Sequence, residues 1–396
     1  MVPSLRNAFN HAFTEEKYRR LLARLDREVG FHIGFRVCES PLFLPAPLVK
    51  RMISAGNEII QQLMSNPTYL ADSTRAIPHE FFVPNETPHP AFVAVDFGIM
   101  QAEDGSFEPR LVEMQGFPSL FAYQPLLSER YQEVYGLSSD LRWLLSGLRR
   151  EEYDTMFRAA VLGGHAPEHV VLLELDPEGQ KTRPDFVLTE RLCGIATVNI
   201  REVIVEANHM FYFRNGRRLA VYRVYNRAIA DELVRSEADL PFSFRDDIQV
   251  EWAGHPNWFF RLSKFSLPYL DHPCVPETVF LSEVAELPDD LDRWVLKPLF
   301  SFAGSGVKVG LSAADLDAIP DSERHRYILQ RRVEYGAFVD TPYGGTKAEV
   351  RILYIWLDHP VAVLTLVRMG RGKMMGVDHN KDMKWVGSSA GLHTAG

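Results

Sequence analysis

The sequence predicts a mixed α+β fold with an α/β passage in its middle, divided into more than one subdomain. The chain has 396 residues, whereas one hydrophobic core usually serves no more than roughly 250–300 residues. Its first 90 residues carry helical periodicity, and its last third is rich in short apolar runs that are typical of strands. Between these two parts, strand and helix patterns alternate, as they do in α/β domains.

The N-terminal part is expected to be helical. Between Glu15 and Val29, the apolar residues Tyr18, Leu21 and Leu25 recur at the spacing of one helix face. A second helix is expected over residues 48–64, because a pair of prolines precedes it. We interpret these helices as packing elements.

A hairpin is expected next. Residues 91–97 form a β-rich run that contains Asp96, and residues 110–115 form a second run that contains Glu113 and Gln115. The turn between them includes Asp-Gly, a hairpin signal, although this connection is longer than two residues.

The middle of the chain mixes both patterns. We expect a helix over residues 140–148 with Ser138 or Ser139 as its N-cap. A buried strand is expected at 170–174, a helix at 184–192 and an extended segment at 195–200. The Asn215-Gly216 pair predicts a tight hairpin within residues 210–222.

The C-terminal part is predicted to be rich in strands. They are expected at residues 278–281, 294–296, 307–309, 327–333, 350–356 and 361–368. The small residues 387–396 are expected either to be partly disordered or to close the last turn.

Composition excludes several classes of protein. The formal net charge of −9 argues against sequence-independent binding of nucleic acid, which needs a basic face. The three cysteines are far apart, and no histidine pair has metal-ligand spacing, so neither a disulfide framework nor a zinc site is indicated. The N-terminus lacks the apolar core of a signal peptide, and no apolar run is long enough to span a bilayer. We therefore expect a cytoplasmic protein without a membrane partner; the sequence leaves a homo-oligomer open.

The first candidate site is a lysine followed by a turn of small residues. Lys297 ends an apolar strand, and Ala303-Gly-Ser-Gly306 connects that strand to the next one. Glycines let backbone N–H groups approach an anion, and a lysine adds a charge suited to phosphate. An ordinary tight turn is the alternative for this segment.

Two further clusters lie later in the chain. The strand from Tyr327 turns from apolar to polar at Gln330 and reaches Glu334, a pattern that could hold an adenosine; the alternative is a strand ending in a charged loop. Glu349 and Arg351 share one face of a strand, and Arg368 ends its neighbour. The two arginines could hold a transferred phosphoryl group; a cross-strand salt bridge on a solvated face is the alternative.

The fourth cluster is acidic. Glu113 and Gln115 share a strand face, and Asp96 on the paired strand can reach the same side. Three oxygen ligands with room for phosphate and water suit Mg²⁺. An exposed acidic hairpin is the alternative, but Asp96 lies within an apolar run, where an unpaired carboxylate is costly.

Together these segments resemble the ATP-grasp superfamily, in particular its circularly permuted, glutathionylspermidine-synthase-like branch. The resemblance is carried by Val95-Asp-Phe-Gly, by Leu111-Val-Glu-Met-Gln-Gly-Phe-Pro, by the segment from Val295 to Val307 and by Tyr327-Ile-Leu-Gln-Arg-Arg-Val. It covers residues 91–120 and 290–370. We call the strand expected to hold the adenosine, Tyr327-Ile-Leu-Gln-Arg-Arg-Val, the hinge. In an ordinary ATP-grasp chain the magnesium-binding acids follow the hinge, whereas here the matching hairpin precedes it, which indicates a permutation.

The resemblance implies four sections. Residues 1–150 would hold the N-terminal helices and the permuted metal-binding hairpin, and residues 151–270 an α/β, pre-ATP-grasp-like substrate domain. Residues 271–340 would form the lid subdomain, and residues 341–396 the C-terminal part of the core.

The resemblance also implies an ATP- and Mg²⁺-dependent ligase that joins a small-molecule carboxylate to an amine through an acyl phosphate. Arg368 and Arg351 would stabilise the transferred group, and Asp96, Glu113 and Gln115 would hold Mg²⁺. The residues expected to bind ATP are Lys297, Ser301, Gly304, Ser305, Gly306, Gln330, Val333 and Glu334.

The chain departs from the family pattern at two points. Gln115 stands where the family has asparagine, and no lysine lies between Phe265 and Leu296, so Lys264 is the nearest substitute for a second ATP-contacting lysine. Two other functions stay open: a nucleotide-binding module without ligase activity, and a kinase that stops at the phosphorylated substrate.

Overall fold

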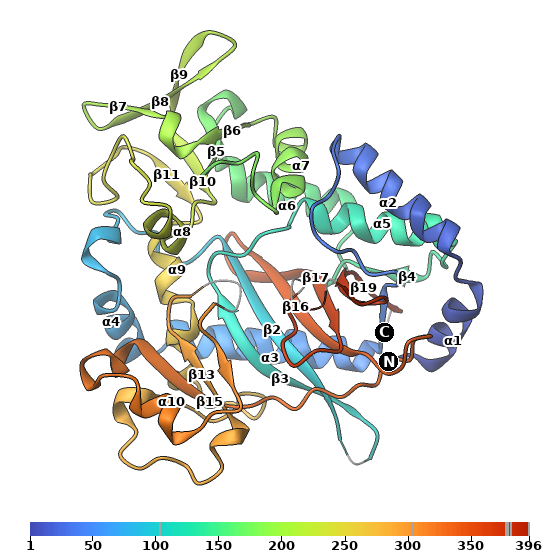
Figure 1. Ribbon diagram of the computed structural model, residues 1–396. Coiled ribbons are helices and arrows are strands. Elements are labelled where there is room, and N and C mark those ends of the chain that lie inside the picture. The colour runs from blue at the N-terminus through green and yellow to red at the C-terminus, as the bar shows by residue number, and fades with distance from the viewer. Residues whose placement is uncertain (103, 302–304, 377–379, 381, 395–396) are drawn as a thin grey trace.

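The computed structural model describes residues 1–102, 104–301, 305–376, 380 and 382–394. At its centre lies a five-stranded antiparallel sheet in the order β18-β17-β16-β2-β3 (Figure 1). Its strands are β2 (Phe92–Gln101), β3 (Phe107–Gln115), β16 (Lys347–Trp356), β17 (Pro360–Gly370) and β18 (Gly387–Ser389). The sheet therefore joins two segments of the chain that are far apart in sequence, and β2 and β16 form the seam between them.

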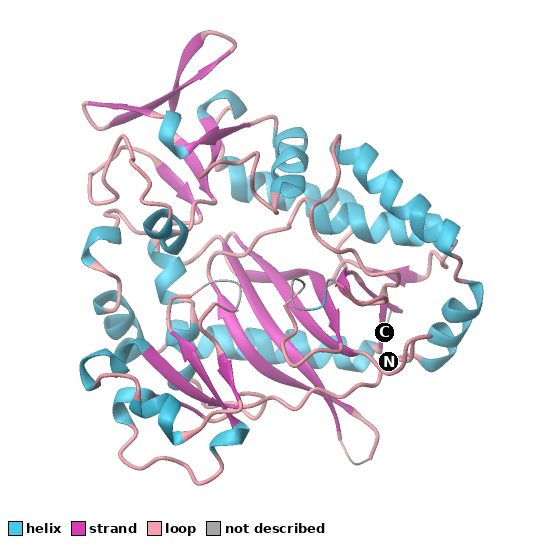
Figure 2. Cartoon of the chain, viewed as in Figure 1, coloured by secondary structure: helices cyan, strands magenta, loops and turns pink. Residues whose placement is uncertain are grey.

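One face of this sheet packs on the long helix α3 (Ala46–Met64), which lies behind the strands in Figure 2. Alternate side chains of β2 and β16, such as Val95 and Ile352, form a buried cluster with Met52 and Ile59 of the helix. A Cβ at Gly56 would lie 2.1 Å from the hydroxyl oxygen of Tyr354. Only glycine lets the helix approach the sheet this closely at that point.

The opposite face of the sheet has two parts. At one end, Phe92 and Leu353 join the apolar cluster formed with helices α5 (Tyr123–Tyr135) and α6 (Arg150–Leu162). At the other end, the side chains on this face are charged: Asp96 on β2, and Glu349 and Arg351 on β16. Strand alternation thus directs the charged groups away from α3.

A second antiparallel sheet, here called the lid sheet, has the order β12-β15-β13-β14. Its strands are β12 (Thr278–Phe280), β13 (Trp294–Pro298), β14 (Lys308–Val309) and β15 (Tyr327–Arg331). Leu296 and Leu329 point into a small core of their own with Leu316 of helix α10 (Ala313–Asp317). Because side chains alternate along a strand, Lys297 and Gln330 lie on the opposite face of the lid sheet, toward the central sheet.

The middle of the chain forms the predicted α/β unit around a parallel sheet, β11-β10-β5-β6. Its strands are β5 (Val170–Glu174), β6 (Ala196–Asn199), β10 (Arg223–Asn226) and β11 (Glu251–Ala253), with helix α7 (Arg183–Cys193) connecting β5 to β6. A small antiparallel sheet projects from this unit (Figure 1), made of β7 (Ile204–Glu206), β8 (His209–Arg214) and β9 (Arg217–Val221). Its turn has positive φ at Asn215 (52°) and Gly216 (74°), which confirms the hairpin predicted there.

The remaining elements pack around these sheets. The helices are α1 (Pro3–Ala12), α2 (Glu15–Val29), α4 (Pro67–Arg75), α8 (Ala230–Arg235) and α9 (Asn257–Arg261). A three-stranded sheet, β1-β19-β4, combines β1 (Leu42–Leu44), β4 (Leu141–Arg142) and β19 (Gly391–Thr394). The small residues 387–394 therefore form two strands, neither disordered nor merely closing a turn. Among the described residues, no helix combines the length and the apolarity needed to cross a membrane.

The helix predicted over residues 140–148 is wrong. This segment instead forms the short strand β4 and a turn with positive φ at Ser146 (53°) and Gly147 (73°). The amide of Leu145 donates to the carbonyl of Val363, and the hydroxyl of Ser146 donates to the carbonyl of Ala362. Contacts with β17 override the local helical pattern.

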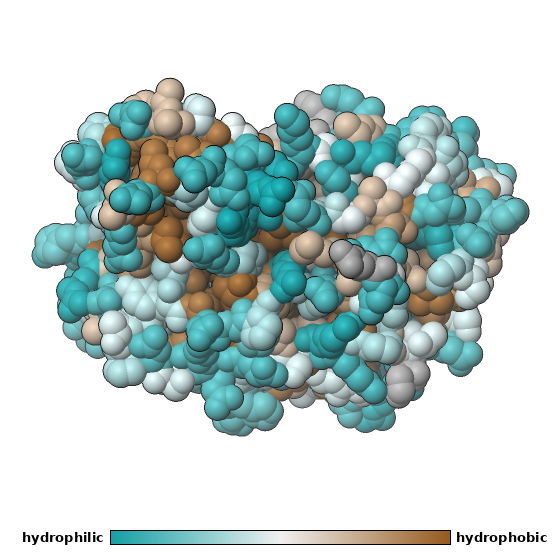
Figure 3. Space-filling model, turned by 90° about the horizontal axis from the view of Figure 1, so that it is seen from below, coloured by the Kyte–Doolittle hydropathy of each residue, from teal (hydrophilic) through white to brown (hydrophobic). Residues whose placement is uncertain are grey.

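The surface seen in Figure 3 is mostly hydrophilic, and apolar side chains gather in a few hollowed areas of it. This agrees with the composition, in which charged residues make up 24% of the chain.

Candidate functional site

A cleft of about 590 Å³ lies between the charged end of the central sheet and the lid sheet. We call it the central cleft. Its volume is typical of sites for small molecules. Charged side chains from five elements of the chain line it, among them Glu113, Lys264, Lys297, Glu349, Arg351 and Arg368. The front and back parts of the chain thus meet around one cavity.

The floor of the cleft holds a buried ion pair. Asp96 is fully buried, and both of its carboxylate oxygens accept hydrogen bonds from Arg351, at 2.6 Å from Nε and 2.6 Å from Nη2. The two residues face each other in the register of β2 and β16. Such a two-point contact is among the strongest hydrogen-bonded arrangements in proteins.

A second ion pair lies beside the first. Arg368 Nη1 donates to Glu349 Oε1 at 2.5 Å and lies 3.4 Å from Asp96 Oδ2. The other oxygen of Glu349 accepts a 2.7 Å hydrogen bond from the Tyr335 hydroxyl. Burial disfavours the charged form of Arg368, but Glu349 and Asp96 outweigh it and raise the pKa of Arg368 above its usual value. The predicted cross-strand salt bridge exists, but it lines the cleft and Glu349 is buried.

Lys297 connects the lid sheet to the central sheet. Its Nζ donates to Gln330 Oε1 at 2.5 Å, and to the carbonyl of Val112 at 2.9 Å. The pairing of β2 and β3 shifts register at this point, so Val112 is the extra residue of a bulge and its carbonyl is available to the lysine. Burial lowers the pKa of Lys297 to about 8, more than Glu113 raises it.

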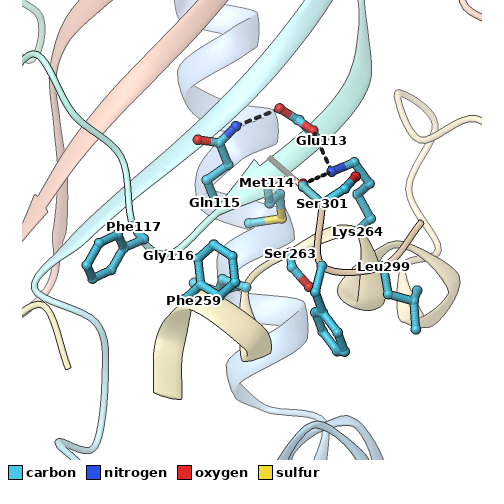
Figure 4. Close-up of a pocket in the computed structure, with 12 residues that line it drawn as sticks. Glu113, Met114, Gln115, Gly116, Phe117, Phe259, Ser263, Lys264, Leu299 and Ser301 are labelled. Atoms are coloured by element: carbon cyan, nitrogen blue, oxygen red, sulfur yellow. Dashed lines mark hydrogen bonds and ion pairs between the residues drawn. The ribbon is translucent and has the colours of Figure 1, made fainter. Parts of the chain in front are cut away.

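Glu113 lies between the cations of the cleft. Lys264 Nζ is 3.6 Å from Glu113 Oε2 and donates at 2.7 Å to the carbonyl of Ser301 (Figure 4). Burial alone would raise the pKa of Glu113. The positive charges of Lys264, Lys297 and Arg351 outweigh burial and lower this pKa to about 2. The electrostatic potential at this carboxylate is therefore strongly positive.

Three polar atoms of the site have no hydrogen-bond partner in the described structure. They are Gln115 Oε1 and Gln330 Nε2 in the lining of the central cleft, and Ser301 Oγ in a small pocket that adjoins it; all three are buried. The amide nitrogen of Gln115 donates to Glu113 Oε1 at 2.6 Å, which leaves its oxygen free (Figure 4). Buried polar atoms are normally paired, so unpaired ones in a cleft indicate a place for a ligand or water.

The loop after β3 is held by the α/β unit. The buried carboxylate of Asp185 accepts hydrogen bonds from the amides of Leu120, Ala122 and Tyr123. Arg227 donates to the carbonyl of Pro118 at 2.8 Å. Arg227 is buried and holds this loop in place.

The predicted hinge and the predicted glycine turn differ in where they lie. Val333 and Glu334 line the central cleft together with Gln330; their role in holding an adenosine stays a prediction. Gly304 lies outside the described residues. Ser305 and Gly306 are exposed and are not among the lining residues, whereas Val307 and Gly310 beyond them are.

Three lining residues were missed or undervalued in the sequence. Lys264 is buried at the start of a short 3₁₀ helix (Lys264–Tyr269), a position without any local motif. Tyr335 follows the hinge, and its contact with Glu349 depends on tertiary structure. Lys347 begins β16 only two positions before Glu349, and strand alternation was the signal that could have found it.

The predicted magnesium ligands lie close together but are already paired. Asp96 faces Glu113 in the register of β2 and β3, and Gln115 contacts Glu113. However, Nη2 of Arg351 stands 2.6 Å from Asp96 Oδ2 and 4.0 Å from Glu113 Oε1, so a guanidinium already bridges the two carboxylates. No group of three or more histidine, cysteine or acidic side chains within the described residues is arranged to hold a metal ion. As these side chains stand, they do not fit a divalent cation; the magnesium site stays a prediction.

Comparison with solved structures places the fold. A glutathione synthetase-like effector from Globodera pallida, solved in its apo form, aligns with 96% of this chain and 96% of its own, with a TM-score of 0.60 and 11% sequence identity. The chain thus has a fold similar to that of a glutathione synthetase-like protein. At this identity the likeness shows the fold alone. No family model and no curated protein matches the sequence.

Proposed function

We propose that the protein is an ATP-dependent ligase that joins a small-molecule carboxylate to an amine, built on a circularly permuted ATP-grasp core. One observation carries the proposal. Lysines and arginines of residues 264–368 converge with the acidic hairpin of residues 92–115 around one cleft. They do so in a fold similar to that of a glutathione synthetase-like protein, whose name points to the same chemistry.

The proposed reaction has two steps. A carboxylate oxygen of the first substrate attacks the γ-phosphorus of ATP, the bond to the bridging oxygen breaks, and ADP leaves with its electron pair. The amine nitrogen of the second substrate then attacks the acyl carbon, phosphate leaves, and the amine loses a proton. Transfer of this kind depends mainly on alignment and charge neutralisation.

The residues of the cleft fit these steps. Lys297 and Lys264 face the region where phosphates would lie, and Arg368 with Arg351 would stabilise the transferred group. The hinge residues Gln330, Val333 and Glu334, with the unpaired Gln330 Nε2, would hold the adenosine. Ser301, Gly304, Ser305 and Gly306 would close over the phosphates as a lid and exclude water.

Magnesium, which the family resemblance implies, would neutralise phosphate charge if Asp96, Glu113 and Gln115 held it. Only the unpaired Oε1 of Gln115 is ready to accept such an ion in the described arrangement. No step of the proposed reaction is therefore assigned to it.

The test is release of ADP from ATP in mixtures of amino acids and polyamines, with the product identified by mass spectrometry. We expect turnover that requires both a carboxylate and an amine and is lost in Glu113→Ala. The matched control is Glu206→Ala on the projecting sheet, where the carboxylate is exposed.

Two results would contradict a ligase. Binding of ATP without turnover in every mixture would favour a nucleotide-binding module. ADP release that yields a stable phosphorylated product and does not depend on an amine would favour a kinase.

A further inference from the structure

We propose that Arg351 takes the place of the metal ion at Asp96, so that the central cleft binds the phosphates of a nucleotide without a divalent cation. The proposal rests on the proposed function for the identity of the nucleotide. It departs from the family pattern, in which carboxylates at these positions would be free to hold magnesium.

The first argument is an inventory of carboxylate oxygens. Both oxygens of Asp96 accept from Arg351. The two oxygens of Glu113 face Gln115 Nε2 at 2.6 Å and Lys264 Nζ at 3.6 Å. Those of Glu349 accept from Arg368 and Tyr335. All six oxygens therefore already face a donor or a cation, whereas Mg²⁺ requires several oxygens at close to octahedral geometry.

The second argument is the balance of charge. Three carboxylates (Asp96, Glu113 and Glu349) face four cations (Lys264, Lys297, Arg351 and Arg368) in one contiguous group. Lys347 and Lys373 add further positive charge to the lining. An excess of positive charge repels Mg²⁺ and attracts phosphate.

The third argument is that Arg351 is not free to leave. It lies within β16, directly opposite Asp96 in the register with β2, and only 5% of its surface is exposed. Moving its side chain away would leave the fully buried carboxylate of Asp96 with Arg368, 3.4 Å from one of its oxygens, as its remaining cation, which is costly. A nucleotide that brings its own negative charge to this cluster requires no such movement.

The experiment measures binding of ATP to the full chain by calorimetry, once with excess EDTA and once with excess Mg²⁺. We expect dissociation constants that agree within about threefold, with free ATP favoured because it carries more negative charge than its magnesium complex. Binding that is more than about tenfold tighter with Mg²⁺ would overturn the proposal but leave the proposed function standing. Absence of binding in both conditions would overturn the two together.

A second measurement uses Mn²⁺ alone as a probe and follows the free ion by electron paramagnetic resonance. We expect no binding of Mn²⁺ to the wild-type cleft. Arg351→Met removes the built-in cation, so this variant should bind Mn²⁺ and should bind ATP at least about tenfold more weakly in EDTA than in Mg²⁺.

The control for this variant is Arg218→Met, which removes an exposed arginine of the projecting sheet and should behave as wild type. Should Arg351→Met fail to fold, the wild-type measurements still decide the matter, because Mn²⁺ bound to the wild-type cleft contradicts the proposal.

Discussion

Two antiparallel sheets of this molecule carry the same kind of ion pair in opposite surroundings. In the central sheet Arg351 lies 2.6 Å from Asp96, and in the projecting sheet Arg218 lies 2.6 Å from Glu206. The side chains of the first pair are 6% and 1% exposed, and those of the second are 38% and 59% exposed. The shortest distance is the same in the two pairs, but Arg351 contacts both oxygens of Asp96 whereas Arg218 contacts one oxygen of Glu206. The pairs differ most in their exposure to solvent.

The comparison shows how exposure to solvent decides what an ion pair contributes to stability. An exposed pair is screened by water and typically contributes about 0–1 kcal/mol to stability. In a buried pair each charge depends on its partner, because no water replaces it. The central cleft therefore holds its charges in fixed positions, whereas Arg217 and Arg218 of the projecting sheet form a solvated face.

The largest expected effect tests this contrast directly. Arg351→Met should lower the free energy of unfolding by about 3–5 kcal/mol, because Asp96 then stays buried without its main partner. Arg218→Met should change it by less than about 1 kcal/mol. Urea denaturation followed by circular dichroism measures both, and similar losses in the two variants would break the comparison.

The next effect concerns the ligand. Lys297→Ala should weaken binding of ATP by about 10–100-fold, since a charged donor at the phosphates is lost. Lys308→Ala on the neighbouring strand β14 is the matched control, because Lys308 is exposed and pairs with Asp315. Calorimetry distinguishes the two, and an unchanged affinity in Lys297→Ala would remove this lysine from the site.

Binding should also depend on pH in the alkaline range. The pKa of Lys297 is lowered to about 8 by burial, so its positive charge is present below that pH and is lost above it. Affinity for ATP should fall by about three- to tenfold between pH 7.5 and pH 9.5. The profile of Lys297→Ala should be flat over the same range; a wild-type profile that is equally flat would assign the lowered pKa no role in binding.

The smallest effect concerns stability in acid. The pKa of Glu113 is lowered from 4.5 to about 2, so its charged form stabilises the folded state above pH 4.5, and this contribution is lost as the pH falls toward 2. Glu113→Gln lacks this titration. It should therefore lose less stability than wild type between pH 5 and pH 3, by on the order of 1 kcal/mol in urea denaturation. If wild type and Glu113→Gln lose the same stability between pH 5 and pH 3, groups other than Glu113 determine the stability in acid.

The sequence predicted those parts of the molecule in which local pattern and tertiary structure agree. The helix over Glu15–Val29 is the same in sequence and structure. Lys297 was singled out because it ends a clear apolar strand and precedes a glycine-bearing turn, and it lines the central cleft. The meeting of Glu113 and Lys297 around one cleft is also present.

Other parts depend on contacts that no local pattern contains. The pairing of Asp96 with Arg351 requires that β2 and β16 lie side by side in one particular register. Lys264 lies on an irregular segment, and its position is set by Ser301 and Glu113. Likewise, residues 140–148 have a helical pattern but form β4 and a turn, because β17 offers them partners.

The seam between β2 and β16 has a consequence for how the chain acquires its structure. Asp96 and Arg351 are 255 positions apart, so β2 leaves the ribosome long before the strand that completes it. Its apolar run, Phe92 to Phe97, must wait without that neighbour while the intervening α/β unit can already form. Assembly of the cleft floor should thus be a slow, late step, and the interval before it is when this protein is most exposed to aggregation and most dependent on chaperones.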